Sequence, residues 1–519
     1  MIRTINKNSP SDSLFELIRS LNPTEKRYIK VLMSKNSGKS YEKLFDVINK
    51  QKVYNEWEIK RKLRGETFIG QLTRVKNYLY EFIVTGLNSY HASYSPAVIL
   101  NRYLTTVEIL FRKRLFVQCK KYLNKAKKLA LRYNEYTAML DILNWERSLM
   151  DIRVNVKKRM SDIDTLATQE ESVLKKISGK NLYRNLYFKA YWLMLKEGVA
   201  RDDKRSDEME KIIKHPFLTD PQNIVDISTR IMYFEIQAFY RQYTGNFSQA
   251  YNYRKKLIGY FTHDLLKTPE YLVRYKMALH NFLVISSYLS RYDNVYNNAL
   301  DELKALSKNN DLSEVVKKDI PVAVFAFQTA KYTGIGKFNE AINLIENEFG
   351  GLTPLIKSDN EFIQFYGFFF MSYFATGNYS KALFWLNKII NYPHSDHRKD
   401  VLFLARIFNI ITHYEKGNYE LIENLVQSTR RYFDKARHHS LFEERVLEFF
   451  RKRMHEIRDE DEKIAAFKVL KKDLTSILKK SKEKLILDYF DFISWLESKI
   501  ENRSFIEIII EKTKMGVGC

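Results

Sequence analysis

The chain has 519 residues, of which 45% are hydrophobic and 14% aromatic, so it holds ample apolar material for a folded core. A formal net charge of +24, from 86 Lys and Arg against 62 Asp and Glu, favours acidic partners. Only two cysteines are present, Cys119 and Cys519, which excludes a disulfide framework and fits a reducing compartment. No apolar segment approaches the roughly 20 residues that span a bilayer, and the N-terminus lacks an export signal. We therefore expect a cytoplasmic protein that does not enter a membrane.

Only 9 prolines and 17 glycines interrupt the chain, and no segment shows the alternating apolar pattern of a β-strand. Helical periodicity recurs along the whole sequence, which predicts an all-α fold. Residues 1–95 are predicted to form a compact module of short helices. Within it, Ser13-Leu14-Phe15-Glu16 and Asn22-Pro23-Thr24-Glu25 each have the pattern of a capping box, in which the first and last side chains start a helix.

Two interpretations of this N-terminal module are open. It is either a cap that seals one end of the helices that follow, or a helix-turn-helix that binds DNA. In the second case residues 56–64 would be the recognition helix, with cations at Lys60, Arg61, Lys62 and Arg64. We favour the cap, because the connection over residues 50–55 is long for such a motif and no wing strands are evident.

Residues 96–219 are predicted to be degenerate helical repeats with a concentrated positive charge. Between residues 102 and 132 there are ten Lys and Arg, opposed by Glu108 alone. Four of them recur at i, i+4, i+7 and i+11 on one helical face, which is typical of a polyanion-binding stripe: Lys121, Lys125, Lys128 and Arg132. The alternative is a solvated helix in a lysine-rich chain. Cys119 lies on the opposite, apolar face and is expected to be a core residue.

Residues 220–455 contain a short phrase that recurs four times. The copies are Gly245-Asn246-Phe247-Ser248-Gln249-Ala250, Gly336-Lys337-Phe338-Asn339-Glu340-Ala341, Gly377-Asn378-Tyr379-Ser380-Lys381-Ala382 and the shorter Gly417-Asn418-Tyr419. A glycine can take the positive φ that ends one helix, the aromatic fills the joint, and a small alanine lets two helices approach. Each copy therefore predicts a corner between two helices.

The spacing of the corners indicates long repeats. Gly336, Gly377 and Gly417 follow one another at intervals of about 40 residues, which is the length of a two-helix repeat unit. The interval from Gly245 to Gly336 is more than twice as long, and a degraded copy that starts at Ser290 divides it into nearly equal halves. A weaker copy starts at Arg114, where Phe116 keeps the aromatic position. Both degraded copies are predicted to be corners without glycine.

These corners resemble those of the tetratricopeptide repeat family, whose helix pairs meet at Gly-Asp/Asn-Tyr/Phe-x-x-Ala, although the family repeat has a length of about 34 residues. The resemblance covers roughly residues 220–430. It implies a right-handed α-solenoid of antiparallel helix pairs, in which each pair buries one side against its neighbours. Residues 456–519 are then expected to form C-terminal capping helices.

In the resembled family the first helix of each pair lines a groove that binds extended peptides. If the family's groove positions are counted back from the corner at Gly417, Leu404, Ile407 and Ile411 would face solvent. The groove positions are therefore chosen by polarity instead. Polar residues that interrupt the apolar first helices predict a protein- or peptide-binding groove: Gln237, Arg241, Gln328, Lys331, Arg406, Asn409 and His413. Hydrogen bonding between helices inside the stack is the alternative explanation.

No segment predicts catalysis, a metal site or a cofactor. Ser37-Gly38-Lys39-Ser40 resembles part of a phosphate-binding loop, but Met33 stands where the motif requires its first glycine. His394, Asp396 and His397 lack a fourth zinc ligand. The sequence therefore favours a non-catalytic scaffold that binds a protein or peptide. The alternative is a nucleic-acid-associated regulator that uses the N-terminal module or the basic stripe.

Overall fold

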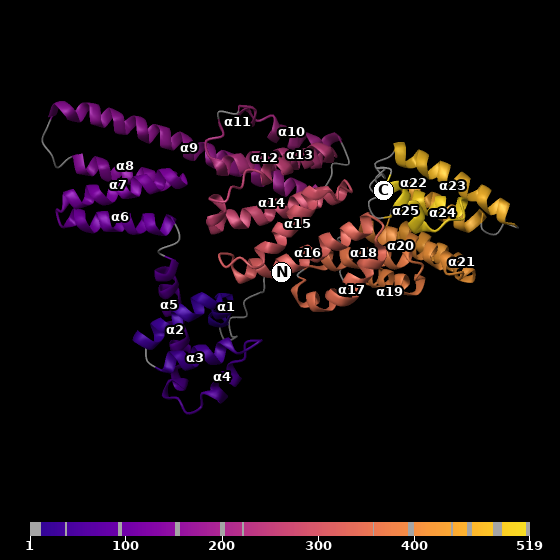
Figure 1. Cartoon of the computed structure of the whole chain (residues 1–519), viewed down its shortest axis with the longest axis horizontal. Helices are drawn as coiled ribbons and strands as arrows, with labels where there is room; N and C mark the ends of the chain where they lie inside the picture. The colour runs from indigo at the N-terminus through magenta and orange to yellow at the C-terminus, as the bar shows by residue number, and fades with distance from the viewer. Residues whose placement is uncertain are drawn as a thin grey trace.

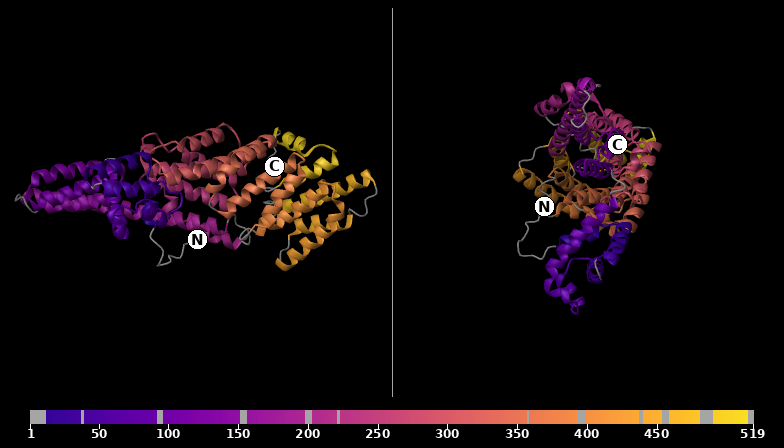
Figure 2. Two further views of the ribbon diagram at one scale, coloured as in Figure 1. Left: turned by 90° about the horizontal axis from the view of Figure 1, so that it is seen from below. Right: turned by 90° about the vertical axis from the view of Figure 1, so that its left-hand side faces the viewer.

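The computed structural model describes residues 12–36, 39–91, 96–150, 156–197, 203–220, 223–356, 358–392, 399–436, 440–453, 459–480 and 490–514. Within these ranges the chain is built from helices and turns, without a β-strand. Most helices pack against the next one along the chain, and together they form an elongated molecule (Figures 1 and 2). The all-α prediction is confirmed.

The N-terminal helices surround a core of their own. They are α1 (Ser13–Ser20), α2 (Pro23–Asn36), α3 (Lys39–Asn49), α4 (Glu56–Lys62), the 3₁₀ turn η1 (Thr67–Gln71) and α5 (Leu72–His91). Ile18, Phe45 and Ile83 are fully buried among them, and Figure 1 shows this part projecting from the side of the molecule. The capping box at Asn22 is confirmed, because the backbone N–H of Glu25 donates to Asn22 Oδ1 at 2.8 Å while Asn22 N–H donates to Glu25 Oε2.

The box predicted at Ser13 is wrong. Ser13 is already the first residue of α1, and Asp12 precedes it as the cap residue without a capping hydrogen bond from its side chain.

Six pairs of helices meet at the predicted corners, and from α12 onward consecutive pairs pack against one another. The first helices are α6 (Pro96–Arg112), α12 (Ile227–Tyr243), α14 (Pro269–Tyr288), α16 (Glu314–Gly334), α18 (Asp359–Ala375) and α20 (Lys399–Glu415). The second helices are α7 (Phe116–Tyr133), α13 (Phe247–Ile258), α15 (Asn294–Leu306), α17 (Phe338–Leu352), α19 (Tyr379–Ile390) and α21 (Tyr419–Ala436).

The remaining helices of the middle region are α8 (Tyr136–Met150), α9 (Val156–Glu197), α10 (Asp203–Ile213) and α11 (Pro216–Thr219), with 3₁₀ turns η3 (Leu265–Lys267) and η4 (Thr353–Leu355) farther along. The long helix α9 packs against α8 near one end of the molecule and against α12 in the central stack, so it joins the two (Figure 1).

The corner glycines have the positive φ that the sequence predicts, 76° at Gly245, 75° at Gly336, 74° at Gly377 and 82° at Gly417. The residue after each glycine donates its N–H to a carbonyl five residues earlier, as from Asn246 to Arg241 at 2.7 Å. This pattern satisfies carbonyls at the helix end. It therefore places the end of the first helix and the start of the second within a few residues.

Two corners without glycine have the same geometry. Ser290 has φ of 50° and Arg114 has φ of 59°, and the residues after them, Arg291 and Leu115, each donate to the carbonyl five residues earlier at 2.9 Å. The degraded copies are therefore structural corners, at which an L-residue accepts the left-handed conformation at some energetic cost. Cys119, at the alanine position of the Arg114 corner, is fully buried as expected.

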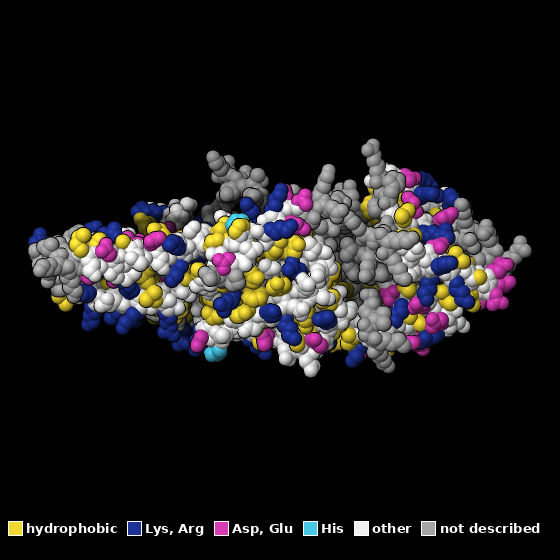
Figure 3. All heavy atoms as spheres, turned by 90° about the horizontal axis from the view of Figure 1, so that it is seen from above, with side chains coloured by type: hydrophobic (Ala, Val, Ile, Leu, Met, Phe, Trp, Pro, Cys, Tyr) yellow, Lys and Arg dark blue, Asp and Glu magenta, His cyan; other side chains and the backbone are white. Residues whose placement is uncertain are grey.

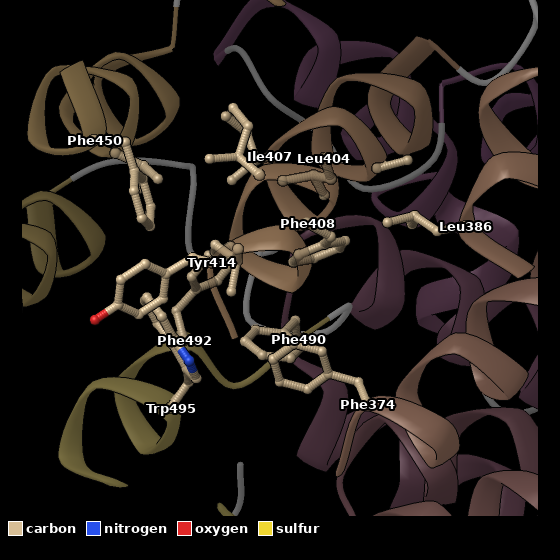
Figure 4. Close-up of a cluster of buried hydrophobic side chains, with 14 of the residues drawn as sticks. Phe374, Leu386, Leu404, Ile407, Phe408, Tyr414, Phe450, Phe490, Phe492 and Trp495 are labelled. Atoms are coloured by element: carbon tan, nitrogen blue, oxygen red, sulfur yellow. The ribbon is translucent and has the colours of Figure 1, made fainter. Parts of the chain in front are cut away.

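The C-terminal helices fold back on the last pairs. They are α22 (Leu441–Glu448), the π-helical turn η6 (Phe449–Arg453), α23 (Glu460–Lys480), α24 (Phe492–Ile500) and α25 (Phe505–Lys514). Figure 4 shows Phe490, Phe492 and Trp495 beside Phe374 and Phe408. The centroids of Phe408 and Phe492 are 5.4 Å apart, and those of Phe374 and Phe490 are 5.2 Å apart. Residues 490–514, called the C-terminal segment below, thus cover side chains of α18 and α20.

Polar contacts join the same elements. Trp495 Nε1 donates to Glu415 Oε1 at 2.7 Å, and Lys499 Nζ lies 2.6 Å from Glu415 Oε2. Farther along, α25 lies over the corner of α16, where a Cβ added to Gly336 would stand 2.8 Å from Cγ1 of Ile510. Gly336 is therefore required both for its backbone conformation and for its close contact with α25.

Candidate functional site

Two of the predicted groove residues of α12 and α16, Arg241 and Lys331, contact a neighbouring second helix. Gln237 is buried. The Arg241 guanidinium lies over the ring of Tyr240 at 4.7 Å and within 6.0 Å of the ring of Tyr253 on α13. On α16, Gln328 is half-buried, and Lys331 Nζ donates to Asn297 Oδ1 of α15 at 2.7 Å.

The predicted residues of α20 face its second helix and its own corner. The Arg406 guanidinium stacks on the ring of Tyr432 of α21 at 3.9 Å. Nε of Arg406 and Oδ1 of Asn409 are buried without a hydrogen-bond partner among the described residues. His413 contacts Asn418, with Nδ1 3.0 Å from Nδ2, and its pKa is lowered by burial and by Lys416. The seven predicted residues lie on three first helices, α12, α16 and α20, which α14 and α18 separate along the chain.

The apolar residues at the family's groove positions on α20 have a structural explanation. Leu404 and Ile411 are buried, and Phe408, on the same face of α20, packs against Phe490 and Phe492 of the C-terminal segment. This face of α20 is apolar because another part of the chain covers it.

An open groove lies at the other end of the molecule, between α6 and α8. Its volume is about 500 Å³. Polar side chains dominate its lining, which consists of Asn101, Leu104, Thr105 and Glu108 of α6 and Asp141, Asn144, Trp145 and Ser148 of α8. No residue of α7 lines it, so it opens on the side of this helix trio that faces away from α7.

The groove combines hydrogen-bonding groups with one aromatic anchor. Trp145 is half-buried and packs on Phe111 with ring centroids 5.3 Å apart, which holds the indole in place. Asp141 is exposed and makes no ion pair within the described part of the chain. Glu108 pairs with Arg112, with Oε1 2.5 Å from Nη2. Such a lining can hold a polypeptide segment by its backbone amides and by one apolar side chain.

The groove on α6 lies at positions equivalent to three buried positions of α20, the middle one of which packs against the C-terminal segment. Asn101, Thr105 and Glu108 lie 13, 9 and 6 residues before the corner residue Arg114. At the same three intervals before the corner residue Gly417, α20 carries Leu404, Phe408 and Ile411. The sequence-based predictions do not include this groove, and a polar set at these three positions before the degraded corner is the sequence signal that identifies it.

The predicted polyanion stripe lies on the outer face of α7. Lys121, Lys125, Lys128 and Arg132 are all exposed. In Figure 3, dark-blue Lys and Arg side chains gather along the lower edge of the left-hand end, where α6–α9 lie in Figure 1. The stripe and the α6–α8 groove therefore belong to different faces of one helical unit.

The cations proposed for a DNA-recognition helix are largely occupied within α4. Lys60 Nζ lies 3.0 Å from Glu56 Oε1, and Lys62 Nζ lies 2.7 Å from Glu58 Oε1. Burial alone would raise the pKa of the Glu56 carboxyl, but hydrogen bonds from Lys76 and Lys60 lower it to about 2. Because two carboxylates lie on so short a helix, α4 presents little net positive charge to a phosphate backbone.

Among the described residues there is no group of three or more His, Cys, Asp or Glu side chains that could hold a metal ion. His394, Asp396, His397, Ser37 and Gly38 lie outside the described residues. A search of the described helices for one long and apolar enough to cross a membrane found none. In comparisons with known protein families and with curated proteins, the chain matched neither a family model nor a curated sequence.

Proposed function

We propose that this protein is a non-catalytic, cytoplasmic scaffold that binds a polypeptide segment in the groove between α6 and α8. The single observation that carries the proposal is the shared register of α6 and α20. On α20 these positions are apolar and buried, and the middle one, Phe408, packs on a segment of the same chain, whereas on α6 they are polar and line an open groove.

The C-terminal segment serves as an internal example of a bound ligand. Phe490 and Phe492 pack on Phe408, while Trp495 and Lys499 bind Glu415 two residues before the corner. The same scaffold can therefore hold a polypeptide by ring packing and by a few polar contacts. The α6–α8 groove offers the same combination to a separate chain, with Trp145 as the anchor and hydrogen-bonding groups around it.

The finer architecture that the resemblance implies is part of this proposal. We take the helix pairs to be antiparallel and to form a right-handed solenoid like that of tetratricopeptide repeats, with first helices on the concave side. Two contacts support this arrangement. The first helix α16 packs against both α14 and α18, which is expected where first helices lie on the inside of a curve.

The experiment selects short linear peptides from a random display library on the full chain and measures their dissociation constants by fluorescence anisotropy. Thr105→Trp fills the groove with an indole, and Asn124→Trp adds the same group to the exposed outer face of α7 as a matched control. We expect Thr105→Trp to weaken binding at least tenfold, which corresponds to about 1.4 kcal/mol.

Circular dichroism and thermal melting would establish that both variants remain folded. Selected peptides that bind the Thr105→Trp protein as tightly as the wild type would refute the groove as the binding site. Affinity lost equally in two folded variants would also count against the groove, because Asn124 lies outside it.

A further inference from the structure

A row of cations on α7 is separate from the groove and has no role in the function proposed above. Lys121, Lys125, Lys128 and Arg132 share one exposed face. Lys120 is exposed beside them. At a rise of about 1.5 Å per residue, successive members of the row stand about 4.5–6 Å apart, and the row is about 16 Å long.

Most of the positive charge in this region has no counter-charge. Glu108 pairs with Arg112, and Lys127 pairs with Glu146 of α8. Eight cations from residues 102–132 make no ion pair within the described part of the chain: Arg102, Lys113, Arg114, Lys120, Lys121, Lys125, Lys128 and Arg132. Asp264, on the connection before α14, senses the charge of Arg132, but its pKa is lowered chiefly by its hydrogen bond with Lys267.

Tyrosine rings hold several of these cations. The Lys125 ammonium lies 5.0 Å from the ring centre of Tyr122, and the Arg132 guanidinium lies 5.6 Å from that of Tyr133. The ring of Tyr103 on α6 packs edge-on against Tyr122 with centroids 5.8 Å apart. Cation–π contacts restrict the motion of long side chains, so binding a partner would require less ordering of these groups.

We propose that the outer face of α7 binds the phosphate backbone of single-stranded nucleic acid. A straight row of closely spaced cations flanked by aromatic rings suits a backbone that can run along one helix while its bases turn toward the tyrosines. A membrane surface fits less well, because the apolar face of α7, with Leu123, Ala126 and Ala130, is buried inside the protein, and the exposed apolar side chains Val117 and Leu131 stand far apart on the helix.

The experiment measures binding of a short fluorescent oligo(dT) and of an oligo(rU) of equal length to the full chain by anisotropy, over a series of salt concentrations. One variant carries Lys121→Glu, Lys125→Glu, Lys128→Glu and Arg132→Glu. The matched control carries four charge reversals at exposed lysines elsewhere, Lys255→Glu, Lys256→Glu, Lys304→Glu and Lys308→Glu. A second stripe variant with Gln in place of Glu covers the case in which reversal disturbs folding.

Four phosphate contacts predict that the logarithm of the association constant falls with the logarithm of salt with a slope of about −3. We expect the stripe variants to lose at least tenfold in affinity at low salt and most of that slope, while the control keeps the larger part of both. The proposal is overturned if stripe and control variants weaken binding equally, or if the wild type does not bind either oligonucleotide at the lowest salt concentration.

Vesicles with an anionic lipid, and a duplex of the same length, test the other polyanions. Binding to the vesicles that depends on the stripe, without oligonucleotide binding, would assign the face to a membrane surface. Tighter stripe-dependent binding of the duplex than of either single strand would also reject the proposal. Because Thr105→Trp leaves α7 unchanged, its oligonucleotide affinity should equal that of the wild type, which separates this inference from the peptide groove.

Discussion

The first helices α6 and α20 end at corners of the same geometry but have different surroundings. On α20, Phe408 is buried beneath Phe490 and Phe492. On α6, Thr105 holds the equivalent position and is exposed in an open groove. The corner sets how two helices meet, whereas the side chains at the three equivalent positions before it decide whether that face is covered by the chain itself.

This difference separates two properties that repeat proteins often combine. The α18–α20 region uses its inner positions for stability, because aromatic rings there join the C-terminal helices to the stack. The α6–α8 region keeps the same positions polar and therefore loses burial there, but it retains a surface that another molecule can reach. We regard the first as the structural end of the molecule and propose the second as its binding end.

The largest effect should follow truncation of the covered position. Phe408→Ala should lower the free energy of unfolding by about 3–5 kcal/mol, because it removes a buried ring that contacts several others. The equivalent change on α6, Thr105→Ala, should cost less than about 0.5 kcal/mol, since that side chain is exposed. Urea denaturation of both variants measures the difference, and a cost at Thr105 as large as at Phe408 would abolish the distinction between the two ends.

Acid should weaken the central stack before the α6–α8 unit. Burial, with Lys276 and Arg254, lowers the pKa of His280 on α14 to about 4, below its unfolded value of about 6.5. Folding therefore favours the neutral form of His280. This contribution to the free energy of unfolding is fully present above about pH 6.5, and up to about 3 kcal/mol of it is lost as the pH falls toward about 4.

The control for this prediction is His280→Gln, which cannot gain the charge. The difference in unfolding free energy between the wild type and this variant should change between neutral and mildly acidic pH, as measured by urea denaturation at each pH. Residues 96–150 contain no histidine, so hydrogen exchange in α6–α8 should show no such histidine-dependent step. A wild type and variant with parallel pH profiles would mean that His280 is not destabilised as a cation in the fold.

A smaller effect is expected at a glycine corner of the covered end. Gly377→Val should cost about 1–3 kcal/mol, because φ of 74° is unfavourable for a β-branched residue. A Cβ at Gly377 would meet no described atom within 4 Å, so backbone strain is the only expected cost. Gly377→Asn, which tolerates the left-handed region better, should recover much of the loss in a thermal melt; equal losses for Val and Asn would argue against strain as the cause.

The smallest effect should be a gain at the binding end. Arg114→Gly replaces a residue at φ of 59° with the one that adopts this conformation freely. The relief of strain is partly offset by the greater freedom of glycine in the unfolded chain, so we expect a stabilisation of no more than about 1 kcal/mol. Arg114→Ala serves as the control in the same thermal melt, because it removes the charge but keeps the Cβ; stabilisation by Ala equal to that by Gly would attribute the gain to charge.

Much of the local structure could be predicted from short patterns. The corner phrase at Gly377 specifies a positive φ and the start of the next helix within a few residues, since both depend on neighbouring atoms. Ser358 and Glu361 form the capping box that begins α18 for the same reason. Even the degraded corner at Ser290 keeps its geometry, because the N–H of Arg291 still donates to Ser286 O at the end of α14. The retained aromatic, Tyr292, donates its hydroxyl to Ala330 O of the next first helix, α16.

The candidate site was less predictable, because polarity alone does not tell a groove from a helix interface. Arg406 looks like a binding residue in the sequence, yet it stacks on Tyr432 of the adjoining helix. Asp141 and Trp145 carry no local pattern that marks them, and they line a groove only because α8 lies beside α6. Lys121 and its three partners could be placed on one face from periodicity, and their exposure follows from the burial of the opposite face.

The sequence by itself determined that this chain is helical, where six of its corners lie, and which face of α7 carries the charge, because each of these depends on residues close to one another along the chain. Only the tertiary structure decided which first helices are covered and which remain open. Phe490 and Trp495 reach α20 from a distant part of the chain, as the hydrogen bond between Trp495 and Glu415 shows, and no local pattern encodes where such a segment will pack. The physical reason is that non-local burial depends on the whole path of the chain, whereas a turn depends only on its own backbone.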